Sequence, residues 1–271
     1  MAEGYVLGNQ DNEIARLEMQ ATLFEPITRQ TLLNAGLKKD MSCIDIGCGS
    51  GSVTRLMADM VGETGHVVGV DIDDRYLQYC TRSINSRPNI EFIHDDICKS
   101  RLVDGKETFD VVYSRFTFHH LTDRSEAVRS MRRLTKKGGT IMIQDLDHAP
   151  GSWLCYPEDK VFNTLRKVYV ALVRKRGGDP LVGRKLYKLL INESLNANVD
   201  CYSPCILMGQ EQYSSLGWQL AESIKPQILD QGLQSKQEYN KMYEGLRKLA
   251  KNKGTFVTYS RLFSALGRNS E

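Results

Sequence analysis

"CIDIGCGSGSV", residues 43–53, is an apolar run followed at once by three glycines within five positions. A short buried strand, an abrupt turn and the start of a helix form the arrangement by which α/β proteins present backbone N–H groups to a bound cofactor. Asp45 lies two residues before the first glycine, Gly47, so a carboxylate also lies near the turn. The stretch therefore predicts a cofactor-binding loop in an α/β protein.

Strand and helix patterns alternate from this loop onward. The predicted strands are residues 42–47, 66–72, 89–96, 109–116 and 140–146, and the predicted helices are 52–61, 75–85 and 123–134. The last of these helices opens with Asp123 and Glu126 at the spacing of a capping box. A helix is also expected at residues 13–35, with Pro26 breaking or kinking it. This alternation is typical of a parallel sheet with helices on both faces.

The pattern changes after residue 150. We predict helices at 161–177 and 183–195, a strand at 198–207, a polar helical region at about 210–250 and a last strand at 255–263. We interpret the late helices as an elaboration of the sheet rather than an independent domain. The expected organisation is thus a single domain, residues 1–271, with a helical leader (1–38), a cofactor-binding core (39–149) and substrate-side insertions (150–271).

Composition excludes several classes of protein. The chain has 271 residues, 41% of them hydrophobic, which is enough to bury a sizeable core. The net charge of +3 does not by itself imply a polyanionic partner. No membrane span and no secretory signal are expected. Seven irregularly spaced cysteines in a chain of this length indicate reduced thiols, and hence a cytoplasmic protein.

The glycine spacing indicates which kind of cofactor the loop serves. A dinucleotide-binding loop would want its third glycine at position 52, where this chain has Ser52. The tighter turn of Gly47, Gly49 and Gly51, with Asp45 beside it, suits a ligand that has a positive amino group and no phosphates. Asp71 follows Gly51 by 20 residues at the end of the second strand. A carboxylate at that place can accept hydrogen bonds from both hydroxyls of a ribose.

A third site is predicted at the end of the third strand. Asp96 lies where its carboxylate could accept a hydrogen bond from an adenine amino group, and the Ile97 backbone N–H could donate to the ring. The carboxyl ends of adjacent parallel strands lie side by side, next to the point where the strand order reverses. The three predicted sites therefore form one groove for a nucleoside-containing cofactor.

In its ordered motifs the chain resembles the class I S-adenosylmethionine-dependent methyltransferases. The likeness is to the branch that acts on small molecules, which includes the ubiquinone and menaquinone methyltransferases. The motifs are "CIDIGCGSGSVT", "VVGVDID", "IEFIHDDI", "FDVVYSRFTFHHL" and "KKGGTIMIQD", and they cover residues 40–147. The resemblance implies a Rossmann-like sheet of seven strands, mostly parallel with one antiparallel strand, and helical lid insertions. It also implies S-adenosylmethionine as cofactor and S-adenosylhomocysteine as product.

The resemblance further implies which residues contact the cofactor. The early segment "YVLG" and the later Gln20 are similar to a leader of this branch that folds over the methionine end. The implied cofactor contacts are Tyr5, Gln20, Asp45, Gly47, Cys48, Gly49, Gly51, Asp71, Ile72, Asp96, Ile97, Ser114 and Arg115.

The sequence does not single out one residue as a catalytic base. His119 and His120 are candidates, because a general base works best when its pKa lies near the working pH. A structural role, hydrogen-bonded at a helix start, is the preferred interpretation. A sulfonium is a reactive methyl donor, so alignment of the reacting groups can supply most of the acceleration. No group of His, Cys and carboxylates has metal-ligand spacing, so no metal is expected.

We expect methyl transfer to an O, N or C nucleophile of a small-molecule acceptor. Between Lys160 and Leu190 there are nine Lys or Arg and one acid, Asp179. This excess is interpreted as a solvated helix face or as a site for an acidic substrate. RNA methyltransferases usually have an Asn/Asp-Pro-Pro-aromatic motif at the fourth strand. This chain has "SRFTF" there, which argues for a small-molecule substrate. Methylation of a protein or RNA, and a non-catalytic cofactor-binding scaffold, stay open as alternatives, and the sequence does not indicate an oligomeric state.

Overall fold

The computed structural model describes residues 10–84, 87–102, 109–210 and 212–270, and the chain divides into two compact units. Unit 1 comprises residues 1–24, 147–181 and 203–261. Unit 2 comprises residues 25–146, 182–202 and 262–271. Each unit is thus assembled from segments that are far apart in the sequence.

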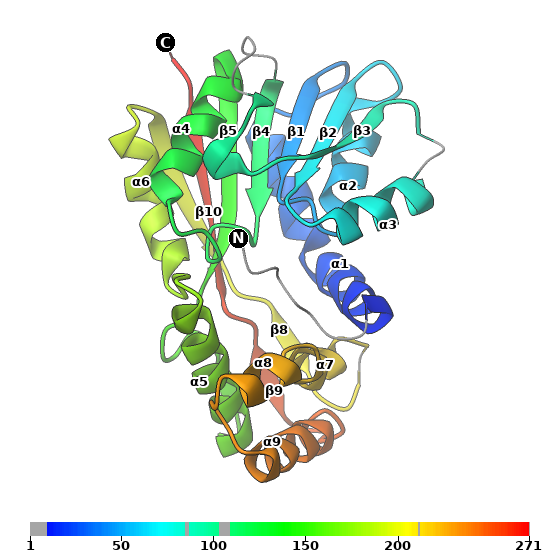
Figure 1. Cartoon of the computed structure of the whole chain (residues 1–271), viewed down its shortest axis with the longest axis vertical. Coiled ribbons are helices and arrows are strands. Elements are labelled where there is room, and N and C mark those ends of the chain that lie inside the picture. The colour runs from blue at the N-terminus through cyan, green and yellow to red at the C-terminus, as the bar shows by residue number, and fades with distance from the viewer. Residues whose placement is uncertain (1–9, 85–86, 103–108, 211, 271) are drawn as a thin grey trace. The chain divides into compact units, whose positions relative to one another are not determined.

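Unit 2 is built on a seven-stranded sheet with the order β3-β2-β1-β4-β5-β10-β7 (Figure 1). Its strands are β1 (Ser42–Ile46), β2 (His66–Asp71), β3 (Ile90–His94), β4 (Phe109–Arg115), β5 (Thr135–Asp147), β7 (Asn196–Tyr202) and β10 (Arg261–Arg268). The pairs β1–β2, β2–β3, β1–β4 and β4–β5 are parallel, whereas β10 and β7 pair antiparallel. The predicted mostly parallel, Rossmann-like sheet of seven strands is confirmed.

Helices cover both faces of this sheet. They are α2 (Ser52–Val61), α3 (Asp74–Ile84), α4 (Arg124–Leu134), α6 (Leu186–Asn192) and the later part of α1 (Gln10–Asn34), with the short 3₁₀ helices η1 (Ile97–Lys99) and η3 (Val182–Lys185). The predicted start of α4 is correct, because Asp123 accepts a hydrogen bond from the Glu126 N–H at 2.9 Å. Helix α1 continues through Pro26 rather than ending there. The proline removes one backbone donor, and the helix tolerates that loss.

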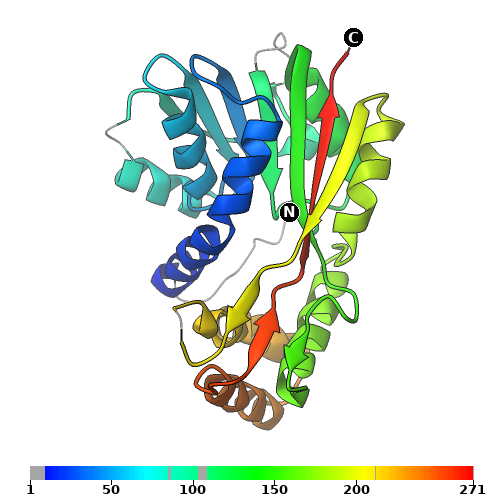
Figure 2. The ribbon, with the colours of Figure 1, turned by 180° about the vertical axis from the view of Figure 1, so that it is seen from behind.

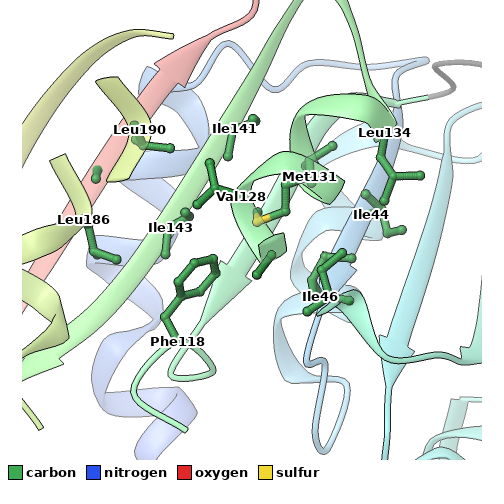
Figure 3. Packing of buried hydrophobic residues seen from close by; sticks show 14 of the residues in the cluster. Ile44, Ile46, Phe118, Val128, Met131, Leu134, Ile141, Ile143, Leu186 and Leu190 are labelled. Carbon is green, nitrogen blue, oxygen red and sulfur yellow. The ribbon is translucent and has the colours of Figure 1, made fainter. Parts of the chain in front are cut away.

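The pleat of the strands explains why two cores form in unit 2. Successive side chains point to opposite faces of a sheet. Ile44 and Ile46 on β1 pack with Val128 and Met131 of α4 on one face, as Figure 3 shows. Cys43, the residue before Ile44, points to the opposite face and belongs to a second cluster that includes buried residues of α1 and α2. Both faces of the sheet are therefore buried, as its apolar strands predict.

Unit 1 contains a second, smaller sheet. It is antiparallel with the order β6-β9-β8, where β6 is Cys155–Tyr156, β8 is Cys205–Leu207 and β9 is Phe256–Thr258. The sequence predicted one continuous strand at 198–207 and another at 255–263, and both predictions were wrong because each region forms two strands. The first region divides into β7 and β8 and the second into β9 and β10, with the two halves in different sheets. Periodicity alone does not show a change of partner strand within one extended segment.

Helices α5 (Lys160–Lys175), α7 (Leu216–Ser223), α8 (Lys225–Asp230) and α9 (Lys236–Leu249), with the 3₁₀ helix η4 (Gln212–Ser215), complete unit 1. Helices α7, α8 and α9 lie on one face of the small sheet (Figures 1 and 2). Helix α9 starts with a capping box, in which Ser235 and Glu238 each bond the other's backbone N–H. Leu165, Ile228 and Leu246 are among the buried residues of a core that unit 1 forms by itself. Among the described residues, no helix combines the length and apolarity that crossing a bilayer requires.

Candidate functional site

The register of unit 2 brings several predicted residues to one edge of the sheet. Ile46 at the end of β1 pairs with Val70 of β2 and with Ser114 of β4. The residues that follow, Gly47, Asp71 and Arg115, are therefore level with one another at the carboxyl ends of three neighbouring strands. The chain leaves β1 toward β2 on one side, while β4 lies on the other. This is the switch point at which open α/β sheets bind ligands.

The loop after β1 depends on glycine for two different reasons. Gly47, Gly49 and Gly51 have φ values of 72°, 53° and 72°, in the left-handed region that side chains disfavour. A Cβ at Gly47 would overlap the side chain of Thr117, and one at Gly51 would lie 2.9 Å from the Cys80 sulfur. A Cβ at Gly49 would meet nothing within 4 Å. Gly47 and Gly51 therefore allow close packing, whereas Gly49 borders open space.

Asp71 ties this loop to the next strand connection. Its Oδ2 accepts a hydrogen bond from the Gly49 N–H at 2.9 Å, and its Oδ1 accepts one from the Asp73 N–H at 2.9 Å. Burial raises the pKa of Asp71, and the backbone hydrogen bonds from Asp73 and Gly49 oppose this rise. The predicted ribose acceptor thus also positions the glycine loop against β2.

Asp45 is a buried carboxylate beneath the same loop. It is 2% exposed, and its Oδ2 accepts a hydrogen bond from the hydroxyl of Thr54 on α2 at 2.7 Å. Burial raises the pKa of Asp45 to about 6, although the Thr54 hydrogen bond and the charge of Arg115 oppose the rise. A carboxylate in this state would be stabilised in its charged form by a further cation. The site therefore fits a cofactor that carries an amino group.

Cys48 and Ile72 differ sharply in exposure. Cys48 is 7% exposed, and its pKa is raised, first by a hydrogen bond with Cys80 and then by burial. The Cys80 thiol donates to the Gly49 carbonyl at 3.3 Å. Cys48 is thus a packing residue rather than a reactive thiol. Ile72 is 51% exposed at the end of β2, and so offers an apolar surface beside Asp71.

Asp96 and Ile97 start the 3₁₀ helix η1. The Asp96 Oδ1 accepts a hydrogen bond from the Cys98 N–H at 3.0 Å, so this carboxylate caps η1. The Ile97 side chain is 5% exposed and packs in the core cluster of Ile44 and Val128. Contact of these two residues with adenine stays a prediction, and Asp96 has a structural role in any case.

Ser114 and Arg115 end β4 with different functions. The Ser114 hydroxyl is fully buried and donates to the Ile46 carbonyl at 2.9 Å, so it joins β4 to β1. The Arg115 Nη1 donates to the Thr28 hydroxyl at 2.8 Å, and its guanidinium lies over the ring of Phe116, 5.3 Å from the centroid. Phe116 has a φ of 59°. Such a conformation is rare for a bulky side chain, and such strain clusters at functional sites.

His119 is held by a buried aspartate. Asp145 accepts hydrogen bonds from the His119 backbone N–H at 3.1 Å and lies 2.8 Å from Nδ1 of the His119 ring. His119 is 3% exposed and Asp145 is 0% exposed. The ring of His120 lies against that of His119, with centroids 3.8 Å apart. His119 is thus a buried, hydrogen-bonded residue in the turn that follows β4 rather than at a helix start, and its structural role stays a prediction.

The predicted leader contacts lie outside unit 2 or outside the described residues. Gln20 belongs to unit 1, where its Nε2 donates to the Tyr259 hydroxyl at 2.6 Å and its Oε1 accepts from Arg16 at 3.4 Å. Tyr5 lies outside the described residues. For both residues, contact with the cofactor stays a prediction.

Four residues of the site gave no signal in the sequence analysis. Thr54 bonds Asp45, Thr28 bonds Arg115, Thr117 packs against Gly47, and Asp145 holds His119. Thr28, Thr117 and Asp145 act through residues at least 26 positions away, so no local spacing could reveal them, whereas Thr54 lies nine residues after Asp45 within the same β–α unit. Within the described ranges, no group of three or more His, Cys, Asp or Glu side chains is placed to hold a metal ion.

Comparison with known proteins gives one family match. Residues 37–170 match a family model described as a methyltransferase domain. A ubiquinone/menaquinone biosynthesis C-methyltransferase, UbiE, from Ectopseudomonas mendocina is 31% identical over 150 residues, which are 54% of this chain and 56% of that protein. The chain spans between a quarter and about half of the length of the curated relatives that it matches.

Solved structures resemble most of the chain in fold. The YcgJ protein of Bacillus subtilis superimposes with a TM-score of 0.59 at 16% identity, over 90% of this chain and 98% of that chain. A phosphoethanolamine N-methyltransferase 2 of Haemonchus contortus, in complex with phosphomonomethylethanolamine and S-adenosylhomocysteine, gives 0.54 at 18% identity, over 88% of this chain and 51% of that chain. At these identities the likeness concerns the fold alone.

Proposed function

We propose that this chain, whose residues 37–170 match a methyltransferase family model, transfers a methyl group from S-adenosylmethionine to a small-molecule acceptor. The observation that carries the proposal is the pair of carboxylates Asp45 and Asp71 at the glycine loop. Asp45 is buried with a pKa of about 6, and Asp71 bonds the loop at Gly49. This arrangement offers one charged partner for an amino group and one acceptor for ribose hydroxyls.

Each residue has a separate task in this proposal. Asp45 neutralises the amino group of the methionine part, and Asp71 accepts the ribose hydroxyls while keeping Gly49 in place. Gly49 leaves room for the ligand, because no atom lies within 4 Å of a Cβ built there. Ile72, half exposed beside Asp71, covers one face of the adenine.

The bound cofactor would supply an electrophilic methyl group on a positively charged sulfur. The chain's contribution is alignment of the acceptor, since such positioning can supply much of a rate enhancement. Arg115, fixed by Thr28, lies at the same edge of the sheet as the loop. We do not assign His119 as a base, because its ring is buried against Asp145.

A small molecule is the proposed acceptor, and its nucleophile is an O, N or C atom. The support is the family match and two relatives, one named as a C-methyltransferase of quinone biosynthesis and one, from Zea mays and 32% identical over 125 residues, named as a phosphoethanolamine N-methyltransferase. These relatives differ in the atom that they methylate. The proposal therefore names the class of acceptor and not the atom.

Two measurements test the proposal in sequence. Calorimetric titration should show binding of S-adenosylmethionine and S-adenosylhomocysteine to the full chain, and NAD and ATP should not compete. Asp74→Asn is the matched control for substitution of Asp71, because Asp74 is a nearby acid whose side chain is 71% exposed. Methyl transfer is then measured as S-adenosylhomocysteine formed with hydroxyl, amine and activated-carbon acceptors. Binding without turnover on any small molecule, protein or RNA would make the chain a cofactor-binding scaffold and overturn the proposal.

A further inference from the structure

Gln144 is a buried polar residue at the centre of the large sheet of unit 2. It lies on β5, which has β4 on one side and β10 on the other, and its side chain is fully buried. The residues before it on β5, Met142 and Ile143, are apolar core residues. Burying an amide that has no hydrogen-bond partner is costly. A glutamine at this place therefore needs partners from neighbouring elements.

The four hydrogen bonds that the Gln144 amide can make are all formed. Its Nε2 donates to the hydroxyls of Thr31, at 3.1 Å, and of Ser264, at 2.7 Å. Its Oε1 accepts from the hydroxyls of Thr28, at 3.2 Å, and of Tyr113. The four partners are buried and come from α1, β10 and β4. One amide thus joins three elements of unit 2 to β5.

Arg115 fixes the direction of these hydrogen bonds. A guanidinium can only donate, and Nη1 of Arg115 donates to the Thr28 hydroxyl at 2.8 Å. The Thr28 oxygen is the acceptor in that bond, so its single proton is directed to Gln144. An amide turned the other way would place a donor nitrogen against this proton. The bonds from Arg115 to Thr28 and from Thr28 to Gln144 therefore form one chain with a single consistent direction.

The second nitrogen of the guanidinium is directed to the glycine loop. Nη2 of Arg115 lies 3.5 Å from the hydroxyl of Ser52, which is the first residue of α2 and follows Gly51 directly. A hydrogen bond of this length is weak. The shorter bond to Thr28 is therefore the contact that sets the place of the guanidinium, with the ring of Phe116 beneath it.

The place of this guanidinium affects the charge of the predicted cofactor site. Burial raises the pKa of Asp45 to about 6; the Thr54 hydroxyl and Arg115 oppose this rise, and the charge of Asp71 adds to it. Among these groups, Arg115 alone is a cation. A guanidinium that moved out into solvent would leave Asp45 beside Asp71 without compensation, so more of Asp45 would be protonated.

Two further titratable groups face Asp45, and both are neutral at the pH values of the test below. Cys48 lies in the glycine loop, and its pKa is raised by a hydrogen bond with Cys80 and by burial. Tyr113 lies on β4, and burial raises its pKa. Neither group changes its charge between pH 5 and pH 8, so neither can mimic an effect of Arg115.

We propose that Gln144 is a positioning residue for the cofactor site, because it holds the Thr28 hydroxyl that fixes the Arg115 guanidinium beside the glycine loop. The hydrogen bonds that carry this role all lie within unit 2. Gln144 touches no reacting atom and acts through Thr28 and Arg115. The consequence for cofactor binding rests on the proposed function.

Two threonines of α1 provide a matched pair of variants. Thr28 and Thr31 each give Gln144 one hydroxyl partner. Thr28 also accepts from Arg115, whereas Thr31 donates to the Thr28 carbonyl at 2.9 Å. Valine has nearly the shape of threonine without its hydroxyl. Thr28→Val and Thr31→Val should therefore lower the melting temperature by comparable amounts, and only Thr28→Val should release the guanidinium.

Gln144 itself is tested by two variants. Gln144→Met removes all four hydrogen bonds at similar volume. Gln144→Asn keeps an amide that is one methylene shorter, and it serves where Gln144→Met does not fold. Melting curves show which variants fold. Because Gln144 acts through Thr28, the Thr28→Val variant decides the matter even if neither Gln144 variant folds.

The measurement is the ionisation of Asp45 in the full chain without ligand, which a merely structural role would not move. It is followed by NMR titration of the side-chain carboxyl ¹³C signal, assigned with Asp45→Asn. We expect the pKa of Asp45 to rise by about half a pH unit in Thr28→Val and in Gln144→Met, and to stay unchanged within error in Thr31→Val. The double variant of Thr28 and Gln144 should match Thr28→Val alone, because both substitutions act on the same guanidinium.

S-Adenosylhomocysteine titration on the same samples reports on the proposed function. A ligand amino group favours ionised Asp45, so a raised pKa weakens binding only where Asp45 titrates. We expect Thr28→Val to bind about two- to threefold more weakly than Thr31→Val at pH 5.5, and equally at pH 7.5.

The outcomes separate this proposal from the proposed function. An unchanged Asp45 pKa in Thr28→Val or in a folded Gln144 variant, or an equal rise in Thr31→Val, would overturn the positioning role. A wild-type chain that does not bind S-adenosylhomocysteine, while the Asp45 pKa responds as expected, would refute the proposed function and leave the positioning of Arg115 by Gln144 standing.

Discussion

The glycine loop of unit 2 differs in chemistry from the apolar pocket that helices α5, α7 and α9 and the small sheet form in unit 1. The loop consists of backbone, with three glycines at positive φ and the buried carboxylates Asp45 and Asp71 around it. The pocket consists of side chains, and no charged residue is among its described lining. A polar ligand needs donors and acceptors at fixed places, which backbone and short side chains provide. An apolar ligand needs only shape and exclusion of water, which many side-chain combinations provide.

The two regions also differ in how well they accommodate a larger side chain in place of glycine. Gly47 has one acceptable residue type, because any Cβ there meets Thr117. Gly217 in the pocket tolerates a Cβ at ordinary contact distances. Substitutions in the loop are therefore expected to impair the protein more than substitutions in the pocket.

The largest expected effect is that of Gly47→Ala. The left-handed conformation costs a non-glycine residue roughly 1–2 kcal/mol, and the overlap with Thr117 adds to this. We expect S-adenosylhomocysteine binding to fall more than a hundredfold, measured by calorimetry, with a lower melting temperature. Gly47→Ala combined with Thr117→Ala should recover part of the loss, because the overlap is relieved while the φ strain stays. Normal affinity in Gly47→Ala would show that the loop is as forgiving as the pocket.

Asp71→Ala comes next. A hydrogen bond to a charged group contributes roughly 1.5–3 kcal/mol, and water replaces part of it, so we expect about a ten- to hundredfold loss of affinity. S-Adenosylmethionine and S-adenosylhomocysteine share the ribose and should weaken by the same factor. Asp71→Asn should cost less, because its amide oxygen can still accept from Gly49 or Asp73. Unequal losses for the two ligands would place the carboxylate away from the ribose.

Cofactor affinity should also depend on pH through Asp45. Its folded pKa is about 6, above its ordinary value of 3.8, so the unliganded protein binds the extra proton and loses stability from this group as pH rises from about 4 to 6. An ammonium group on the ligand favours the ionised form, so affinity should change in the opposite direction. We expect about a tenfold loss of S-adenosylhomocysteine affinity between pH 7 and pH 5.

Asp45→Asn is the control for this pH effect. It should bind more weakly at pH 7 and show a much flatter dependence, since Asp45 no longer titrates. A steep dependence that survives in Asp45→Asn would assign the effect to another group, such as Asp71, whose pKa burial also raises.

The smallest expected effect concerns the basic end of α5. Arg174 and Lys175 are exposed, and the Lys175 Nζ donates to the Gln231 carbonyl at 2.6 Å. Surface substitutions of this kind usually change stability by less than about 0.5 kcal/mol. We expect Arg174→Gln to leave the S-adenosylhomocysteine affinity unchanged within error by titration. A tenfold loss for an anionic ligand would instead favour the alternative that this face binds an acidic substrate.

The features that could be predicted from the amino-acid sequence are those with local signals. The alternation of strands and helices from residue 42 to 147 follows from periodicity, and the loop follows from three glycines with Asp45 and Asp71 at family spacing. The start of α4 follows from Asp123 and Glu126. In each case the atoms that matter lie within a few residues or one β–α unit, so the pattern and the physical cause coincide.

The other features depend on the three-dimensional fold, because they arise from contacts between residues far apart in the chain. Asp96 had a plausible cofactor role by position, and the structure shows it capping η1 as well. The pocket brings together Trp153 and Tyr259, more than a hundred residues apart, around a space that no periodicity encodes. The sequence patterns of β7–β8 and of β9–β10 each resemble one continuous strand, because an extended segment has the same residue pattern whichever sheet it joins. Hydrophobic burial is non-directional, so apolar residues in a sequence predict that a core forms but not where a pocket lies within it.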